Sequence, residues 1–172
     1  MNLTQEIEAK QKNKAALRRV YEDVFVGRDI DAIDELFEPD AVFHSTALPE
    51  GPTRGREEYK QFVGDFHAAF TDAEVDILAS VAEGDLVVVR AIVTATHTGT
   101  FRGIPATGRR VSVSEMVMVR GVDGRCSEAW SAFDTLGLIR QLGLFPKGDP
   151  PRALVSSVVG LQKVARRLSR RR

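Results

Sequence analysis

The sequence predicts a single α+β domain in which helices pack on the concave face of a curved sheet. Its first part carries apolar residues at the helical spacings of three and four. From Glu74 to Asp134 apolar and polar residues alternate as in strands, and the turn sequences Glu83-Gly84-Asp85 and Val122-Asp123-Gly124 indicate antiparallel hairpins. Helices followed by a run of long strands are typical of an α+β domain with a mixed or antiparallel sheet. A ligand is expected between the sheet and the helices.

Three helices are predicted before the strands. The first contains Leu17, Val20, Tyr21, Val24 and Phe25 and ends at a left-handed cap on Gly27. A second, short helix begins after Asp29 and ends before Pro39, and a strand over 41–45 follows. The third helix carries an aromatic stripe formed by Tyr59, Phe62, Phe66 and Phe70.

Four strands are predicted next, at 75–81, 86–98, 110–120 and 125–134, with a short helical turn at 136–145. Because the helices cover only one face, the other face of the sheet is expected to form a homodimer contact. The residues proposed for this contact are Val87, Val89, Val111 and Val113.

The composition is that of an ordinary globular protein with one core, at 172 residues and 43% hydrophobic. The single Cys126 excludes an internal disulfide and favours a reducing cytoplasm. The polar stretch 1–14 resembles neither a signal peptide nor a membrane anchor.

The charge distribution separates a domain over residues 1–145 from a linker and basic amphipathic tail over 146–172. From Arg152 onward there are seven Lys and Arg residues and no acid, so the rest of the chain is acidic. The tail is expected to dock on this acidic body or to fray. Contact with an anionic membrane or an acidic protein surface is the alternative, and no nucleic-acid partner is expected.

Several motifs resemble one family. The stretch Thr96-His97-Thr98-Gly99-Thr100-Phe101-Arg102-Gly103-Ile104-Pro105-Ala106-Thr107-Gly108-Arg109 is similar to the THTG-x-F-x-G-IPPTGR signature of SnoaL-like polyketide cyclases, with Ala106 in place of the second proline. The segments Glu128-x-Trp130-x-x-x-Asp134 and Gln141-Leu142-Gly143 resemble the end of the family pattern. Together with 39–44 upstream, these motifs cover about 16–145.

This resemblance implies the cone-shaped nuclear transport factor 2-like fold, an α+β barrel. It also implies an enzyme of secondary metabolism that closes a polyketide ring by intramolecular aldol condensation with neither metal nor cofactor. Two alternatives stay open because fold alone does not give function: a non-catalytic small-molecule-binding or assembly protein, and a hydrolase of the limonene epoxide hydrolase type.

The resemblance places the acid/base residue at Asp134, and the alternative for Asp134 is a helix cap. Strand alternation puts Glu128, Trp130 and Asp134 on one face, which is expected to line the pocket. Glu128 is expected to assist, or to form a salt bridge. His97 and His44 are candidates for polarising a carbonyl, with a structural role as the alternative. The expected substrate contacts are Trp130, Tyr21, Phe70 and Phe101, although Tyr21 and Phe70 also suit a core.

No metal is expected, because the three histidines are scattered along the chain without the spacing of a ligand set. His67, on the third predicted helix, is expected at the surface or its boundary.

Overall fold

The structure is a computed structural model that describes residues 2–46 and 51–144. The predicted linker and basic tail at 146–172 lie outside the described residues. Six strands form one mixed sheet in the order β2-β1-β6-β5-β4-β3. Neighbouring strands are antiparallel except β1 and β6, which are parallel. The strands are β1 (Phe37–Ser45), β2 (Thr53–Arg54), β3 (Glu74–Glu83), β4 (Leu86–Thr96), β5 (Arg110–Val122) and β6 (Arg125–Phe133).

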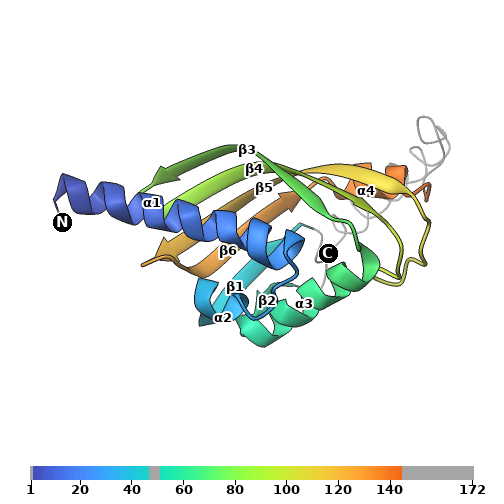
Figure 1. The fold of residues 1–172 in the computed structure, drawn as a ribbon, viewed down its shortest axis with the longest axis horizontal. Helices are drawn as coiled ribbons and strands as arrows, with labels where there is room; N and C mark the ends of the chain where they lie inside the picture. Colours follow the sequence, from blue (N-terminus) through green and yellow to red (C-terminus); the bar gives the residue numbers. More distant parts are fainter. Residues whose placement is uncertain (1, 47–50, 145–172) are drawn as a thin grey trace, which may run out of the picture.

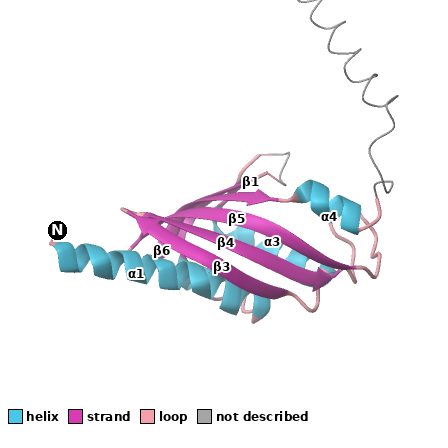
Figure 2. Cartoon of the chain, turned by 90° about the horizontal axis from the view of Figure 1, so that it is seen from above, coloured by secondary structure: helices cyan, strands magenta, loops and turns pink. Residues whose placement is uncertain are grey.

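The helices cover one face of this curved, unclosed sheet, which confirms the predicted fold class (Figure 1). They are α1 (Leu3–Arg19), the π-helix η1 (Val20–Val26), α2 (Ile33–Leu36) and α3 (Gly55–Ala69), and a further helix, α4 (Thr135–Gln141), lies at the end of the sheet. The view from above shows α1 running along the sheet and α4 at its far end (Figure 2). We call the helix-covered face of the sheet the inner face and the opposite one the outer face.

The inner face carries the main core. Val87, Val89, Ala91, Val119 and Ala129 are buried there against α1, η1, α2 and α3. The four valines expected at a dimer contact were therefore assigned to the wrong face: Val87, Val89, Val111 and Val113 are all at most 4% exposed. Alternation along β4 and β5 directs these odd-numbered residues inward, under the helices.

The first predicted helix is longer than expected and ends differently. It continues from α1 into η1, where the Gly27 N–H donates to Glu22 O and the Asp29 N–H to Asp23 O. Gly27 is right-handed (φ −71°), and Arg28 takes the left-handed conformation (φ 62°), so the predicted cap on Gly27 is wrong. A glycine is needed for another reason, since a Cβ there would lie 2.7 Å from Asp23 O.

The second predicted helix is shorter than expected. The Asp29 carboxylate accepts from the Ala32 N–H, as a cap does, but α2 ends at Leu36 and Phe37 already belongs to β1. Pro39 therefore lies in a strand. The β1–β6 register shifts between Phe37 and Val42, so the proline falls where the ladder is interrupted.

At the far end α4 covers an edge of β5. Because β6 ends opposite Glu115, residues before Glu115 have no strand on that side. The Gln141 side chain accepts from the Ser112 N–H (2.8 Å) and donates to Ser112 O (2.9 Å). Leu142 is buried beside Val111, and Gly143 (φ 78°) lies against the Arg109 guanidinium. This gives each residue of the Gln141-Leu142-Gly143 motif a structural role.

Candidate active site

An acidic residue stands among the apolar residues of the inner face. Glu115 lies on β5 between Val113 and Val117, opposite Ala91 on one side and Phe133 on the other. Burial raises the pKa of the Glu115 carboxyl, and an interaction with Tyr21 acts in the opposite sense. A carboxyl in such surroundings is poorly solvated, which is a common property of functional acids.

The Tyr21 hydroxyl lies beside this carboxyl. Tyr21 is 4% exposed, and its pKa is raised mainly by burial and to a smaller extent by the neighbouring Glu115. The geometry nevertheless falls short of a regular hydrogen bond, and the hydroxyl has no hydrogen-bond partner among the described residues. Tyr21 belongs to η1, and π-helical turns often occur at functional sites. The structure therefore places Tyr21 in the interior, facing an acid.

Two further side chains complete the interior. Tyr59 of α3 is stacked on Phe43 with ring centroids 3.8 Å apart, and burial raises its pKa, with smaller contributions from Cys126 and Glu115. Ser80 of β3 is opposite Val89, which is buried on the inner face. Its hydroxyl is buried without a partner in the described part of the chain. Buried polar groups are seldom left unpaired, so the Tyr21 and Ser80 hydroxyls suit a ligand or water.

His97 lies just beyond β4, is fully buried, and packs on Phe70 with ring centroids 5.2 Å apart. The Thr107 N–H donates to its Nδ1 (3.3 Å), which places the proton of the neutral ring on Nε2. That Nε2 has no partner within the described ranges. Burial lowers the pKa of His97, so the ring is favoured as a neutral donor. Phe101 packs on Phe70 in the same cluster.

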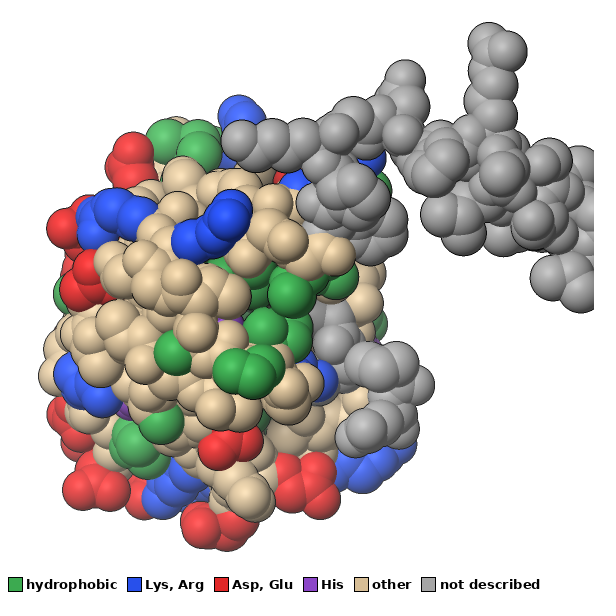
Figure 3. All heavy atoms as spheres, turned by 90° about the vertical axis from the view of Figure 1, so that its right-hand side faces the viewer, with side chains coloured by type: hydrophobic (Ala, Val, Ile, Leu, Met, Phe, Trp, Pro, Cys, Tyr) green, Lys and Arg blue, Asp and Glu red, His purple; other side chains and the backbone are tan. Residues whose placement is uncertain are grey.

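Both α4 and the segment that follows β4 lie at this end of the molecule. The space-filling view of this end shows apolar side chains gathered near the middle, with charged groups around them (Figure 3). Phe101 and Ile104 are partly buried against the cluster that includes Phe70 and Leu138. Phe70 and Phe101 are thus placed together, as part of an apolar wall.

Asp134 is exposed and follows the last residue of β6. Its carboxylate accepts from the Gly137 N–H (2.8 Å) and caps α4, while its own N–H donates to Ser114 O. The capping alternative for Asp134 is therefore present in the structure.

Glu128, Trp130 and His44 lie on the outer face, so the expectation that their face lines the interior is wrong. The register pairs Phe43 with Ala129, both buried on the inner face, and His44 with Trp130 beside them. His44 Nε2 is 3.0 Å from Glu128 Oε1, and its ring is stacked on Trp130.

Arg120 completes this outer cluster. It donates to Glu128 (3.0 Å) and lies 5.5 Å from the centroid of the Trp130 ring. The salt-bridge alternative for Glu128 is thus the one that the structure contains. His67 was also misplaced by the sequence: it is 4% exposed, and its Nε2 lies 3.2 Å from Phe25 O, in the position of a hydrogen bond to that carbonyl.

Sequence reasoning missed Glu115, although a signal was present. Residues 111, 113, 117 and 119 are all valine, so an acid at 115 interrupts a strictly apolar strand face. No sequence signal singles out Ser80.

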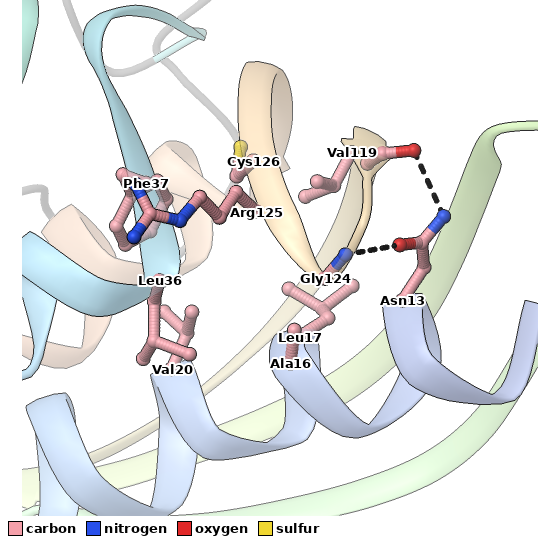
Figure 4. A pocket seen from close by; sticks show the side chains of 11 residues that line it. Asn13, Ala16, Leu17, Val20, Leu36, Phe37, Val119, Gly124, Arg125 and Cys126 are labelled. Atoms are coloured by element: carbon pink, nitrogen blue, oxygen red, sulfur yellow. Dashed lines mark hydrogen bonds between the residues drawn. The ribbon is translucent and has the colours of Figure 1, made fainter. Parts of the chain in front are cut away.

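A separate small hollow lies between α1 and the β5–β6 hairpin (Figure 4). It encloses little space, is partly open to solvent, and is lined mostly by apolar side chains, with Asn13 at one side. Asn13 donates to Gly121 O (2.8 Å) and accepts from the Gly124 N–H (3.0 Å). Burial raises the pKa of the Cys126 thiol in its wall to about 12, which leaves it unreactive.

Over residues 2–46 and 51–144, no three His, Cys, Asp or Glu side chains gather as metal ligands. No helix in these ranges is long and apolar enough to cross a membrane.

A curved sheet with helices on one face, and with unpartnered polar groups buried on that face, is typical of α+β proteins that bind small molecules. The family model for SnoaL-like polyketide cyclases matches residues 15–142. The chain belongs to the SnoaL-like polyketide cyclase family.

The curated relatives are named as cyclases. The chain is 30% identical to the aklanonic acid methyl ester cyclase DauD of Streptomyces sp. (strain C5), over 74% of this chain and 79% of that protein. It is 31% identical to the nogalonic acid methyl ester cyclase of Streptomyces nogalater, over 66% and 84%. These relatives support a cyclase role in antibiotic biosynthesis.

Solved structures agree. Wild-type IdmH of Streptomyces antibioticus is similar at 32% identity and a TM-score of 0.67, over 76% of this chain and 98% of IdmH. An LEH-like epoxide hydrolase of M. tuberculosis has a TM-score of 0.63 at 18% identity, over 88% and 98%, which is a likeness of fold alone.

Proposed function

We propose that the protein closes a ring of a polyketide methyl ester by an intramolecular aldol reaction, with no cofactor. A base removes a proton from a carbon flanked by carbonyls, the resulting enolate carbon attacks a ketone of the same molecule, and the new alkoxide takes up a proton. One C–C bond forms and the proton is returned, so the product is an isomer of the substrate.

The observation that carries this proposal is the unpartnered Tyr21 hydroxyl beside Glu115 on an otherwise apolar face. An enolate forms most readily where its oxygen meets fixed donors and water is excluded. The named activities of the relatives supply the substrate class.

We assign the acid/base step to Asp134, because this residue matches the final aspartate of the family's E-x-W-x-x-x-D segment. The case for Glu128 and His44 as catalytic residues is weaker, because their side chains pair with each other on the outer face. We propose that the Nε2–H of His97 donates a hydrogen bond to a substrate oxygen. Tyr21, Phe70 and Phe101 are proposed as substrate contacts, whereas Trp130 lies with the outer cluster.

The test is turnover of aklanonic and nogalonic acid methyl esters, followed by chromatography for a product of unchanged mass. Asp134→Asn is expected to lower the rate by about 10²- to 10⁴-fold, because the amide has no basic lone pair. Glu128→Gln is the matched carboxyl control and should cost less. Wild-type turnover by Asp134→Asn would move the acid/base step elsewhere, and no turnover by the wild type would favour a binding protein.

We further propose that residues 1–145 are the folded unit, that the protein is cytoplasmic, and that it self-associates through the outer face. The outer face carries exposed apolar side chains, including Met116 (51% exposed) and Val81 (63% exposed). Such side chains on an uncovered sheet face favour a second copy as partner.

A further inference from the structure

The carboxyl of Glu115 has no positively charged partner. No ion pair within residues 2–46 and 51–144 includes it. Its strand neighbours on the inner face are Ala91 and Phe133, and the ionisable groups that interact with it across the interior are Tyr21 of η1 and Tyr59 of α3. Apart from Tyr21, nothing described around Glu115 therefore stabilises a negative charge on it.

We propose that Glu115, in its neutral form, and Tyr21 donate hydrogen bonds to a single ligand oxygen and together form an oxyanion site. That the oxygen is the carbonyl that becomes the enolate rests on the proposed function. The two-donor site itself rests only on the two side chains.

Burial supports the neutral form of both groups, since it raises the pKa of Glu115 and of Tyr21. A carboxyl kept neutral by apolar surroundings can donate to a developing oxyanion beside a tyrosine hydroxyl. The two groups are adjacent, yet the Tyr21 hydroxyl is left without a hydrogen-bond partner in the described part of the chain. The donor of Tyr21 is thus available to a ligand oxygen that also contacts Glu115.

Glu115→Gln separates a donor from a base. Glutamine keeps the shape and an N–H donor but cannot accept a proton from carbon. If Glu115 donates, this variant replaces an acid donor by a weaker amide donor, so its loss of activity and binding is much smaller than the loss expected for Asp134→Asn. If Glu115 is the base, the variant loses activity as severely as Asp134→Asn is expected to.

Binding of 2-naphthol, read by its absorbance and fluorescence across pH, tests the site without turnover. Two donors favour the naphtholate, so the pKa of bound 2-naphthol is expected to fall below that of free 2-naphthol. Tyr21→Phe should weaken naphtholate binding by about 10- to 100-fold, the effect of losing one hydrogen bond to a charged oxygen. Tyr59→Phe is the control and should change it less. Bound naphthol that stays protonated, or an absence of binding, would overturn the proposal.

Infrared difference spectra of wild type minus Glu115→Gln provide a second measurement at neutral pH. This difference spectrum is expected to contain the C=O stretch of a protonated carboxylic acid. The control is the difference spectrum of wild type minus Glu83→Gln, which changes an exposed strand glutamate and should lack this band. An ionised carboxylate at Glu115 would refute the two-donor site even if naphthol binds. Naphtholate binding by a wild type that converts no polyketide ester would leave the site standing and remove the cyclase proposal.

Discussion

The stability of Glu115→Gln relative to the wild type is expected to increase as pH rises. A carboxyl whose pKa is raised in the folded state binds more protons there than in the unfolded chain. The free energy of unfolding of the wild type therefore falls as pH rises from the ordinary glutamate value, about 4.3, to the raised folded value. Above that value the loss is complete and constant. The neutral glutamine has no such loss.

The slope of this effect follows from one proton. Between the two pKa values the stability of the wild type relative to Glu115→Gln falls by at most about 1.4 kcal/mol per pH unit. For a chain of this size that is about 3–6 °C in Tm per pH unit. The lowered pKa values of His67 and His97 act in the opposite sense, adding stability as pH rises, but they are present in both proteins and cancel.

Differential scanning calorimetry of both proteins from about pH 4 to pH 8 measures the difference in Tm. Glu83→Gln, which changes an exposed glutamate, controls for the loss of one surface charge. A difference in Tm that stays constant over this range would refute the raised pKa of Glu115.

Three further predictions concern stability and association. Asn13→Ala removes two hydrogen bonds and orphans Gly121 O and the Gly124 N–H, so urea unfolding should give a loss of about 2–4 kcal/mol. Deletion from Arg152 onward should leave the Tm within a few degrees, and a larger loss would make the tail part of the core. Met116→Glu should shift the sedimentation of a self-associated wild type toward the monomer, and a monomeric wild type at micromolar concentration would contradict the outer-face contact.

The strands were predictable because their signals are local. The alternation of valines and the turn at Asp123-Gly124, where both residues have positive φ, fix the β5–β6 hairpin from neighbouring residues alone. The end of the first helix was not predictable, because a π-helical turn differs from an α-helix only in which carbonyl each N–H meets. The short α2 depends on the pairing of Phe37 with Cys126, which is remote in sequence.

The inner and outer faces of β6 were harder still. Cys126 and Ala129 are both buried although they are three residues apart, and the β5–β6 register shifts at Arg120 and Gly121. A single irregularity of this kind inverts which side chains point inward. Glu128 and Trp130 were expected in the interior because their face carries two carboxylates and an indole, and simple alternation gives no sign of the irregularity. Glu115, on a regular part of its strand, could have been found.

The amide of the Gln141 side chain pairs with the backbone N–H and C=O of Ser112, as the backbone of a neighbouring strand would. An exposed strand edge is a template on which a second chain can add and begin a polymer. One residue of α4 thus closes the backbone at Ser112 to intermolecular pairing. Glutamate at 141 would lack the donor and open half of that template, so the glutamine protects the solubility of the protein as well as its fold.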